Sequence, residues 1–172
     1  MTLPSAMGID WALDNGCFNQ YEPKKILRML EKWQGLSGCK FAVLPDVIGI
    51  HSETYLLSMQ WIDLYHRLDY PPAFVLQNGC TVNDVPYNEL AAVFVGGDND
   101  YKQSHHVTDI SHEAHRRGLW VHWGRVGGLK RLTSIRNHSH IDSFDSTGFS
   151  IHPPKIKKWI PHQKAKQLAL AM

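Results

Sequence analysis

Six short apolar runs punctuate the chain, and each is continuous rather than alternating with polar residues. They are rich in Val, Phe, Ala and Leu, which is typical of strands buried on both faces of a parallel sheet. The runs are IDWAL (9–13), KFAVL (40–44), AFVLQ (73–77), AAVFVGG (91–97), LWVHWG (119–124) and HIDSFD (140–145). The pattern therefore predicts six parallel strands.

Segments with helical periodicity separate most of these runs. In 22–34, Pro23 suits a first helical turn, and Ser52 is the expected cap of a helix over 51–68. The apolar positions of the first segment recur on one helix face: Ile26, Met29, Leu30 and Trp33. Two further helices are predicted over 104–118, ending at Gly118, and over 127–139.

This strand–loop–helix repeat leads either to an open doubly wound sheet or to a (β/α) barrel. Polar residues or glycines follow every apolar run, and in a barrel these carboxyl ends converge on one rim. We therefore expect an α/β fold of the TIM (β/α) barrel type over residues 1–150. The chain has 172 residues, against ~250 for a typical eight-stranded barrel, so the barrel is expected to be reduced.

Composition narrows the class of protein. With 43% hydrophobic and 20% charged residues, the chain matches one globular domain. Three cysteines lie far apart with no CxxC pair, which fits a reducing compartment. Neither a signal peptide nor a run near the ~20 apolar residues of a membrane span is present. We expect a cytoplasmic protein.

Positive charge gathers in two places. Residues 151–172 contain five lysines and no acidic residue, so a basic C-terminal tail or helix is predicted there. Lys157 and Lys158 beside Trp159 suit phosphate contacts with one aromatic ring for stacking, although a solvated terminal helix explains the pattern equally well. A second basic group flanks a predicted rim loop: Arg125, Lys130 and Arg131.

The strand ends supply the candidate chemistry. Asp14, Asp46 and Asp145 follow three runs, Gln77 follows a fourth, and a glycine pair, Gly96 and Gly97, follows a fifth. Carboxylates and an amide suit a flat ligand with N–H donors, such as a guanine-like base, and glycine lets backbone approach a ring. A carboxylate also serves as a nucleophile at an anomeric carbon. The alternative is that these are ordinary turn residues.

Eleven histidines raise the question of a metal. The pair His105-His106 and the stretch from His112 to His115 are the densest groups, but HEAH lacks the HExxH spacing of zinc proteases. We interpret them as surface histidines and expect no metal site. His122 alternates with apolar neighbours and is expected to be a hydrogen-bonded histidine inside the barrel.

Six segments in order resemble the barrel motifs of the tRNA-guanine transglycosylase superfamily. They are ALDNGCFN (12–19), FAVLPDVIG (41–49), FVLQNG (74–79), AVFVGG (92–97), VHWGRVGGLKRL (121–132) and IDSFDST (141–147). The resemblance is strongest to the short phage and bacterial DpdA-like members, which insert 7-deazaguanine derivatives into DNA. The zinc-binding CxCxxC element of the tRNA enzymes is absent. The motif of Asp14 starts almost at the N-terminus, so the barrel is also expected to be N-terminally incomplete.

The resemblance implies a role for each residue at the strand ends. Asp145 matches the carboxylate nucleophile, with Asp142 as the second candidate, and Asp14 matches an acidic residue that contacts the base and handles protons. Asp46 and Gln77 match positions that hydrogen-bond the purine edge. The pair Gly96 and Gly97 matches the backbone part of the base site.

The implied activity replaces guanine in DNA with a 7-deazaguanine base, such as 7-cyano-7-deazaguanine, through a covalent Asp-glycosyl intermediate. Neither a metal nor a redox cofactor is required. The expected partners are DNA, that base, and either a second copy of the chain or a partner protein, but no membrane; a phage-encoded protein would act in the host cytoplasm. The alternatives are a tRNA-guanine transglycosylase acting on tRNA and a non-catalytic remnant that binds a base or nucleic acid.

Overall fold

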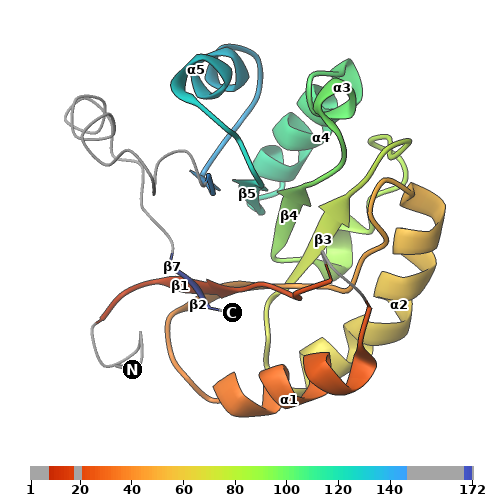
Figure 1. The fold of residues 1–172 in the computed structure, drawn as a ribbon, viewed down its shortest axis with the longest axis vertical. Coiled ribbons are helices and arrows are strands. Elements are labelled where there is room, and N and C mark those ends of the chain that lie inside the picture. Colours follow the sequence, from red (N-terminus) through yellow and green to blue (C-terminus); the bar gives the residue numbers. More distant parts are fainter. Residues whose placement is uncertain (1–7, 18–20, 147–168, 172) are drawn as a thin grey trace.

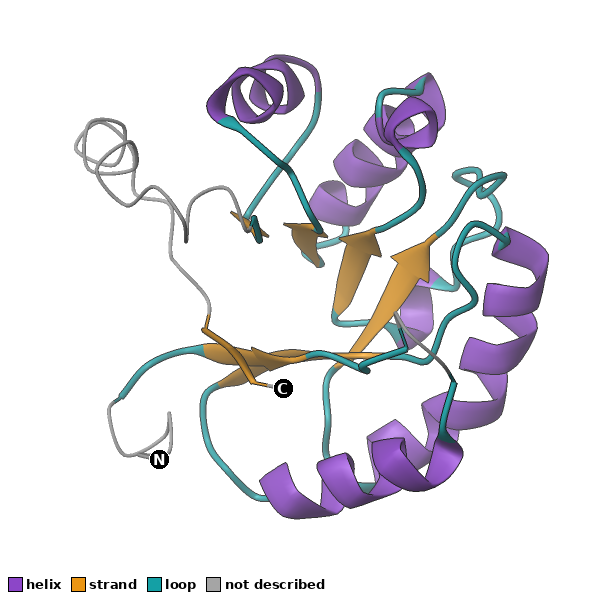
Figure 2. Cartoon of the chain, viewed as in Figure 1, coloured by secondary structure: helices purple, strands orange, loops and turns teal. Residues whose placement is uncertain are grey.

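The computed structural model describes residues 8–17, 21–146 and 169–171. It shows an α/β fold in which parallel strands form a curled half-barrel with helices on its outer side (Figures 1 and 2). The strands are β1 (Trp11–Leu13), β2 (Cys39–Val43), β3 (Pro72–Leu76), β4 (Ala92–Val95), β5 (Trp120–Trp123), β6 (Ser143–Phe144) and β7 (Ala169–Ala171). The six predicted strands are confirmed, each within a few residues of its predicted bounds.

Helices connect the strands much as predicted. They are α1 (Pro23–Trp33), α2 (His51–Arg67), α3 (Asn99–Lys102), α4 (His105–Arg116) and α5 (Leu129–His138), with a short 3-10 turn over Tyr87–Glu89. The prediction of Ser52 as a cap is wrong, because α2 begins at His51 and its cap position is Ile50. Gly118 does follow α4 with φ +80°, in the left-handed conformation that ends helices.

Strand order is sequential, β6-β5-β4-β3-β2-β1-β7, and every pair is parallel. An open doubly wound sheet reverses its strand order near the middle, so that alternative does not describe β1 to β6. Right-handed crossovers between successive neighbours place all the helices on one face. The other face is left to form a concave interior.

The interior is lined by alternate residues of each strand. Three alanines, Ala12, Ala73 and Ala92, lie on this face with Phe41 and Val43. The sheet curls toward this face (Figure 1). Phe41 of β2 and His122 of β5 come within 5.4 Å between ring centroids, although β3 and β4 lie between their strands.

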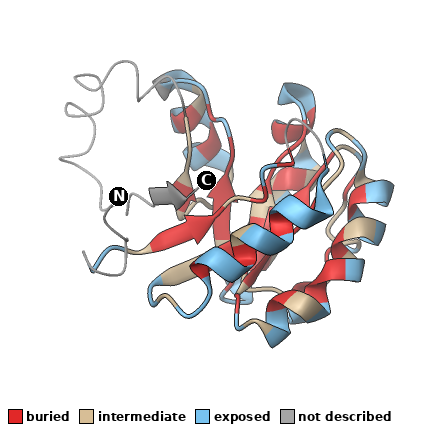
Figure 3. Cartoon of the chain, turned by 60° about the horizontal axis from the view of Figure 1, so that its bottom comes forward, coloured by how far each residue is buried: buried red, intermediate tan, exposed pale blue. Residues whose placement is uncertain are grey.

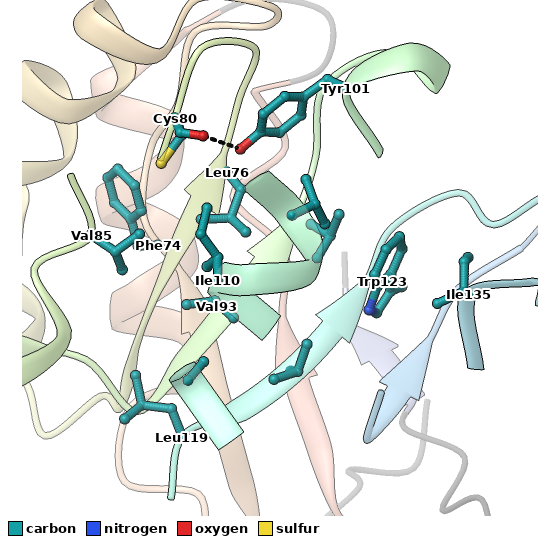
Figure 4. Packing of buried hydrophobic residues seen from close by; sticks show 14 of the residues in the cluster. Phe74, Leu76, Cys80, Val85, Val93, Tyr101, Ile110, Leu119, Trp123 and Ile135 are labelled. Carbon is teal, nitrogen blue, oxygen red and sulfur yellow. Dashed lines mark hydrogen bonds between the residues drawn. The ribbon is translucent and has the colours of Figure 1, made fainter. Parts of the chain in front are cut away.

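Two clusters under the helices form the outer core. Around β1 and β2, α1 and α2 bury Ile26, Leu30 and Trp33, as the helical periodicity predicts, while Met29 is half-buried. Around β3 to β6, the larger cluster includes Phe74, Val93 and Trp123 (Figure 4). In Figure 3 the buried faces of the helices lie against the sheet and their outer faces are exposed.

The predicted basic tail lies outside the described residues except for 169–171. Those three residues form β7, which pairs parallel with β1 and covers the edge that β1 otherwise presents. Lys157 and Lys158 are not among the described residues. Within the described part of the chain, no helix combines the length and the apolar character needed to cross a bilayer.

Candidate functional site

The alternation of each strand carries over into the loop that follows it. Residues 12, 73, 75 and 92 face the interior. Because side chains repeat every two residues, the same face continues at Asp14, Gln77, Gly96, Gly124 and Asp145. Four predicted site residues, Asp14, Gln77, Gly96 and Asp145, therefore extend the inner surface at the carboxyl edge of the half-barrel.

Asp46 lies in a network of amide side chains at this edge. Asn15 Nδ2 donates to Asp46 Oδ1 at 2.8 Å and Gln77 Nε2 donates to Asp46 Oδ2 at 2.7 Å. Each amide is held in turn, because Asn15 Oδ1 accepts from the backbone N–H of Cys17 and Gln77 Oε1 from that of Gly49. Burial raises the pKa of Asp46, although the two amides act in the opposite direction.

Asp14 is half-buried, and its Oδ1 accepts from the backbone N–H of Gly16 at 3.3 Å. Its negative charge is one of the causes that raise the pKa of Asp46. The structure thus brings Asp14, Asp46 and Gln77 together at the ends of β1, β2 and β3.

Asp145 has different partners at the end of β6. Its Oδ1 accepts from the backbone N–H of Arg125 at 2.8 Å, and His122 Nε2 lies 3.3 Å from its Oδ2. Burial works to raise the pKa of Asp145, but the hydrogen bonds from His122 and Arg125 and the nearby charge of Lys102 outweigh it and lower the pKa. The group is therefore a carboxylate at neutral pH.

His122 is only 1% exposed and belongs to a directed chain of hydrogen bonds. Trp120 Nε1 donates to Ser143 Oγ at 2.7 Å, and that hydroxyl lies 2.8 Å from His122 Nδ1. With Oγ accepting from Trp120, the Ser143 hydroxyl hydrogen is available to Nδ1, which places the imidazole proton on Nε2, facing Asp145. The expectation of a satisfied histidine inside the barrel is confirmed.

Arg125 adopts a strained backbone conformation, with φ +48°. Positive φ is uncommon for residues other than glycine and costs on the order of 1–3 kcal/mol. Here it coincides with the backbone N–H that Arg125 donates to Asp145. The strain therefore falls at the residue that positions the predicted nucleophile.

Lys102 is a residue that the sequence analysis missed. Its side chain is 7% exposed, and Nζ donates to the carbonyl oxygen of Gly124 at 2.6 Å. Burial, reinforced by the charge of Arg125, lowers the pKa of Lys102 to about 8. Asp98 positions the short helix α3 that carries it, because Asp98 Oδ1 caps the backbone N–H of Tyr101 at 2.8 Å.

Asp142 and Asp145 lie at opposite ends of β6. Asp142 Oδ2 accepts from the backbone N–H of Val121, at the start of β5, and Asp142 Oδ1 lies 3.0 Å from His140 Nε2. Alternation predicts different faces for the two carboxylates, and only Asp145 contacts the inward-facing His122. The second candidate nucleophile is thus remote from the carboxyl edge.

The predicted glycine pair is needed for packing. A Cβ at Gly96 would lie 2.8 Å from Val75 Cγ1 and 2.9 Å from the carbonyl oxygen of Leu76. Gly97 has φ +75°, and a Cβ there would lie 2.6 Å from Tyr101 Cδ1. Close contact with the end of β3 accounts for Gly96, and close contact with the Tyr101 ring accounts for Gly97. Contact of either glycine with a base stays a prediction.

The other basic residues follow β5. Arg131 Nη1 donates to Asn99 Oδ1 at 2.7 Å, and the charges of Arg131 and Arg125 both act on Lys102. Lys130 is exposed in the first turn of α5. Positive charge therefore concentrates on the Asp145 side of the edge.

The dense histidine groups do not converge. His105 and His106 pack against each other, with ring centroids 3.9 Å apart. In the other group, His112 Nε2 lies 3.1 Å from the carbonyl oxygen of His138, whereas His115 stacks on His140 at 3.5 Å. Comparison with known proteins adds no assignment: neither a protein-family model nor a curated protein matches this sequence.

Proposed function

We propose that the carboxyl edge of the half-barrel exchanges a nucleic-acid base, replacing guanine in DNA with a 7-deazaguanine derivative. The Asp145 carboxylate attacks C1′ of a deoxyguanosine, the bond from C1′ to N9 breaks, and guanine takes the electron pair and a proton as it leaves. The incoming base then attacks C1′, loses its proton and releases the carboxylate. Two displacements give net retention.

The observation that carries this proposal is the environment of Asp145. It faces the interior, is oriented by one backbone N–H and one imidazole, and lies near a buried lysine. An oxygen nucleophile at C1′ has to be anionic and held in one orientation. Both requirements are met at Asp145, whereas Asp142 bonds to the opposite end of the neighbouring strand.

The Asp46 network supports recognition of a guanine-like base. The Watson–Crick edge of guanine carries two kinds of N–H donor, so a protein needs acceptors to bind it. Each oxygen of Asp46 accepts one amide hydrogen bond and has a further lone pair. The raised pKa of Asp46, beside Asp14, suits a group that exchanges a proton with the leaving or entering base.

The cations at the Asp145 side support a polyanionic substrate. Three basic residues follow β5, the strand that pairs with β6: Arg125, Lys130 and Arg131. A base inside a duplex has to be extruded before C1′ is reached, and basic groups next to the pocket hold the phosphates while this happens. The predicted tail lysines would extend this contact.

We further propose that the half-barrel is the (β/α) barrel of the transglycosylase superfamily in reduced form. Sequential parallel order, helices on one face and polar residues at the carboxyl edge support this assignment. A second copy of the chain or a partner protein would complete the wall beside β6.

Radiolabelled guanine incorporation tests the proposal, with DNA and tRNA offered separately to the same preparation. Nucleoside mass spectrometry with 7-cyano-7-deazaguanine as the incoming base identifies the product. Exchange into DNA that Asp145→Ala abolishes is the expected result. Incorporation into tRNA alone would redirect the assignment to the tRNA enzymes, and exchange retained in Asp145→Ala would overturn the role of Asp145. Base or DNA binding without any exchange would identify a non-catalytic binder.

A further inference from the structure

A second polar cluster lies beside the loop that follows β3, apart from the Asp145 edge. His51 begins α2, and Cys80 and Asp84 belong to the loop between β3 and the Tyr87–Glu89 turn. One ligand atom from each of the three lies within 4.8 Å of the others. Separated by 29 and 4 positions, the three residues form no recognisable sequence motif.

The backbone around Cys80 is held at both ends. Its N–H donates to the carbonyl oxygen of Gln77 at 3.0 Å, and its own carbonyl accepts from the Tyr101 hydroxyl at 3.0 Å (Figure 4). The side chain is fully buried among apolar residues. The backbone of Cys80 is therefore fixed by two hydrogen bonds, and its buried sulfur lies 3.7 Å from the carbonyl oxygen of Thr81.

Asp84 and His51 are oriented by contacts of their own. Asp84 Oδ2 accepts from the backbone N–H of Thr81 at 2.8 Å and from its hydroxyl at 2.6 Å. The His51 ring packs edge-on against Phe74 and Tyr55, with centroids 6.2 and 6.3 Å away. Neither residue has to rearrange widely to meet a shared ligand.

The two nitrogens of the His51 ring have incomplete hydrogen bonding. Its Nδ1 is enclosed and has no hydrogen-bond partner among the described residues, while Nε2 lies 4.0 Å from Asp84 Oδ2, beyond hydrogen-bond length. Leaving a buried polar atom unsatisfied costs about 1–3 kcal/mol. The side chain is only 15% exposed, and the exposed part does not include Nδ1.

We propose that His51, Cys80 and Asp84 bind a divalent transition-metal ion, with zinc as the best match. Thiolate, imidazole and carboxylate together are a zinc donor set, and three protein ligands leave a fourth tetrahedral position for water. The thiol excludes magnesium and calcium, which take oxygen ligands. On binding, the Cys80 thiol gives its proton to solvent and its sulfur donates an electron pair to the ion.

Such an ion would join two parts of the fold that support the base pocket. The backbone N–H of His51 donates to the carbonyl oxygen of Asn78 at 3.2 Å, and Gln77 precedes that residue. A metal would add a second tie between the start of α2 and the loop after β3. This inference does not depend on the proposed base exchange, because it concerns ligands outside the catalytic residues.

Cobalt substitution tests the site directly. The metal-free full-length chain is titrated with Co²⁺, and a thiolate-to-cobalt charge-transfer band with tetrahedral d–d bands is expected at one equivalent. Zinc should displace the cobalt and bleach both bands. Saturation at about 100 times the dissociation constant should raise the melting temperature by roughly 5–10 °C.

Variants decide which residues bind. Cys80→Ser should remove the charge-transfer band, and Asp84→Asn and His51→Ala should each weaken binding by about 10–100-fold or more. Cys39→Ser, at a half-buried cysteine on β2, is the matched control and should leave the titration unchanged. If the wild-type chain shows no charge-transfer band, or if folded Cys80→Ser or Asp84→Asn binds zinc as tightly as the wild type, the proposal is overturned.

Discussion

Asp46 and Asp145 occupy corresponding places on the half-barrel, each just beyond a parallel strand, yet the pKa values of their carboxyl groups are shifted in opposite directions. Asp46 is surrounded by neutral amides and by the negative Asp14, and burial raises its pKa. For Asp145, burial works in the same direction, but His122, a backbone N–H and Lys102 outweigh it and lower the pKa. The residue type and the strand end are the same, so the partners set the difference.

The opposite pKa shifts of Asp46 and Asp145 suit two different chemical roles at the same edge of the half-barrel. A carboxyl group with a raised pKa suits proton exchange with a base, while one with a lowered pKa suits attack at C1′ as a carboxylate. Pairs of carboxyl groups with divergent pKa values are a recurrent arrangement in acid–base and glycosyl chemistry. The predictions below test whether the two sides of the edge differ as proposed.

Replacing each carboxylate by its amide should have the largest and most unequal effect. Asp145→Asn should lower kcat for guanine exchange by about 10³-fold or more, because the nucleophile is lost. Asp46→Asn should mainly raise KM for the base, by about 10–100-fold, the worth of one charge-assisted hydrogen bond. Steady-state kinetics measures both, with the exposed Asp63→Asn on α2 as control. The reverse order of effects would exchange the two roles.

Lys102 should give exchange an alkaline limit. Its pKa is about 8, so its positive charge beside Asp145 is present below that pH and is lost above it. Exchange by the wild type should therefore decline above about pH 8. The Lys102→Met variant should catalyse exchange about 10-fold more slowly and should not show this decline above pH 8. The Lys24→Met variant, changed on the exposed face of α1, should still show it. If the decline above pH 8 persists in the Lys102→Met variant, a group other than Lys102 causes it.

The two carboxylates should also affect stability with opposite pH dependence. The lowered pKa of Asp145 stabilises the fold above about pH 4, and this contribution disappears as pH falls through the folded-state pKa. The pKa of Asp46 is raised, so the pH dependence is opposite. The contribution of Asp46 to the free energy of unfolding is largest at low pH and declines as pH rises through the folded-state pKa.

Urea unfolding at several pH values checks this directly. The cost of Asp145→Asn should be smallest at low pH and should grow as pH rises toward 7. The cost of Asp46→Asn should be about 1–3 kcal/mol in acid, because its new NH₂ faces the NH₂ of Asn15 or Gln77, and should shrink as pH rises. Costs that change in the same direction would refute the contrast.

The smallest expected effect is on the salt dependence of DNA binding, which should differ between variants on the Asp145 side and on the Asp46 side of the edge. Arg131 lies on the Asp145 side, where positive charge concentrates, and Lys25 lies on α1 near the Asp46 side. Arg131→Ala should reduce the slope of log affinity against log salt by about 1 for a DNA oligonucleotide, because one phosphate contact is lost. Lys25→Ala should leave the slope unchanged in fluorescence anisotropy. Equal slopes for the two variants would place the DNA elsewhere.

Most elements were predictable because their signals are local. Buried parallel strands appear as short continuous apolar runs, and α1 buries Ile26, Leu30 and Trp33 at the spacing that its sequence shows. The start of α2 was predicted correctly at residue 51, but its cap position is Ile50 and not Ser52. Helix α3 has only four residues, too few for a periodic signal.

The candidate site was predictable only in part. Asp14, Asp46, Gln77 and Asp145 follow apolar runs, and parallel strands bring such positions to one edge. Lys102 gives no signal in the sequence, because a lysine four residues after an aspartate in a short polar segment resembles a solvated one. Its burial arises from contact between α3 and the end of β5.

The amino-acid sequence by itself determined the strand–helix repeat and which polar residues end the strands, because both depend on patterns within a few residues. Only the tertiary structure decided how far the sheet curls, that His122 and Lys102 lie beside Asp145, and that His51, Cys80 and Asp84 meet. Those outcomes depend on contacts between distant segments. The curvature of the sheet brings groups from non-adjacent strands together, as the contact between Phe41 and His122 shows.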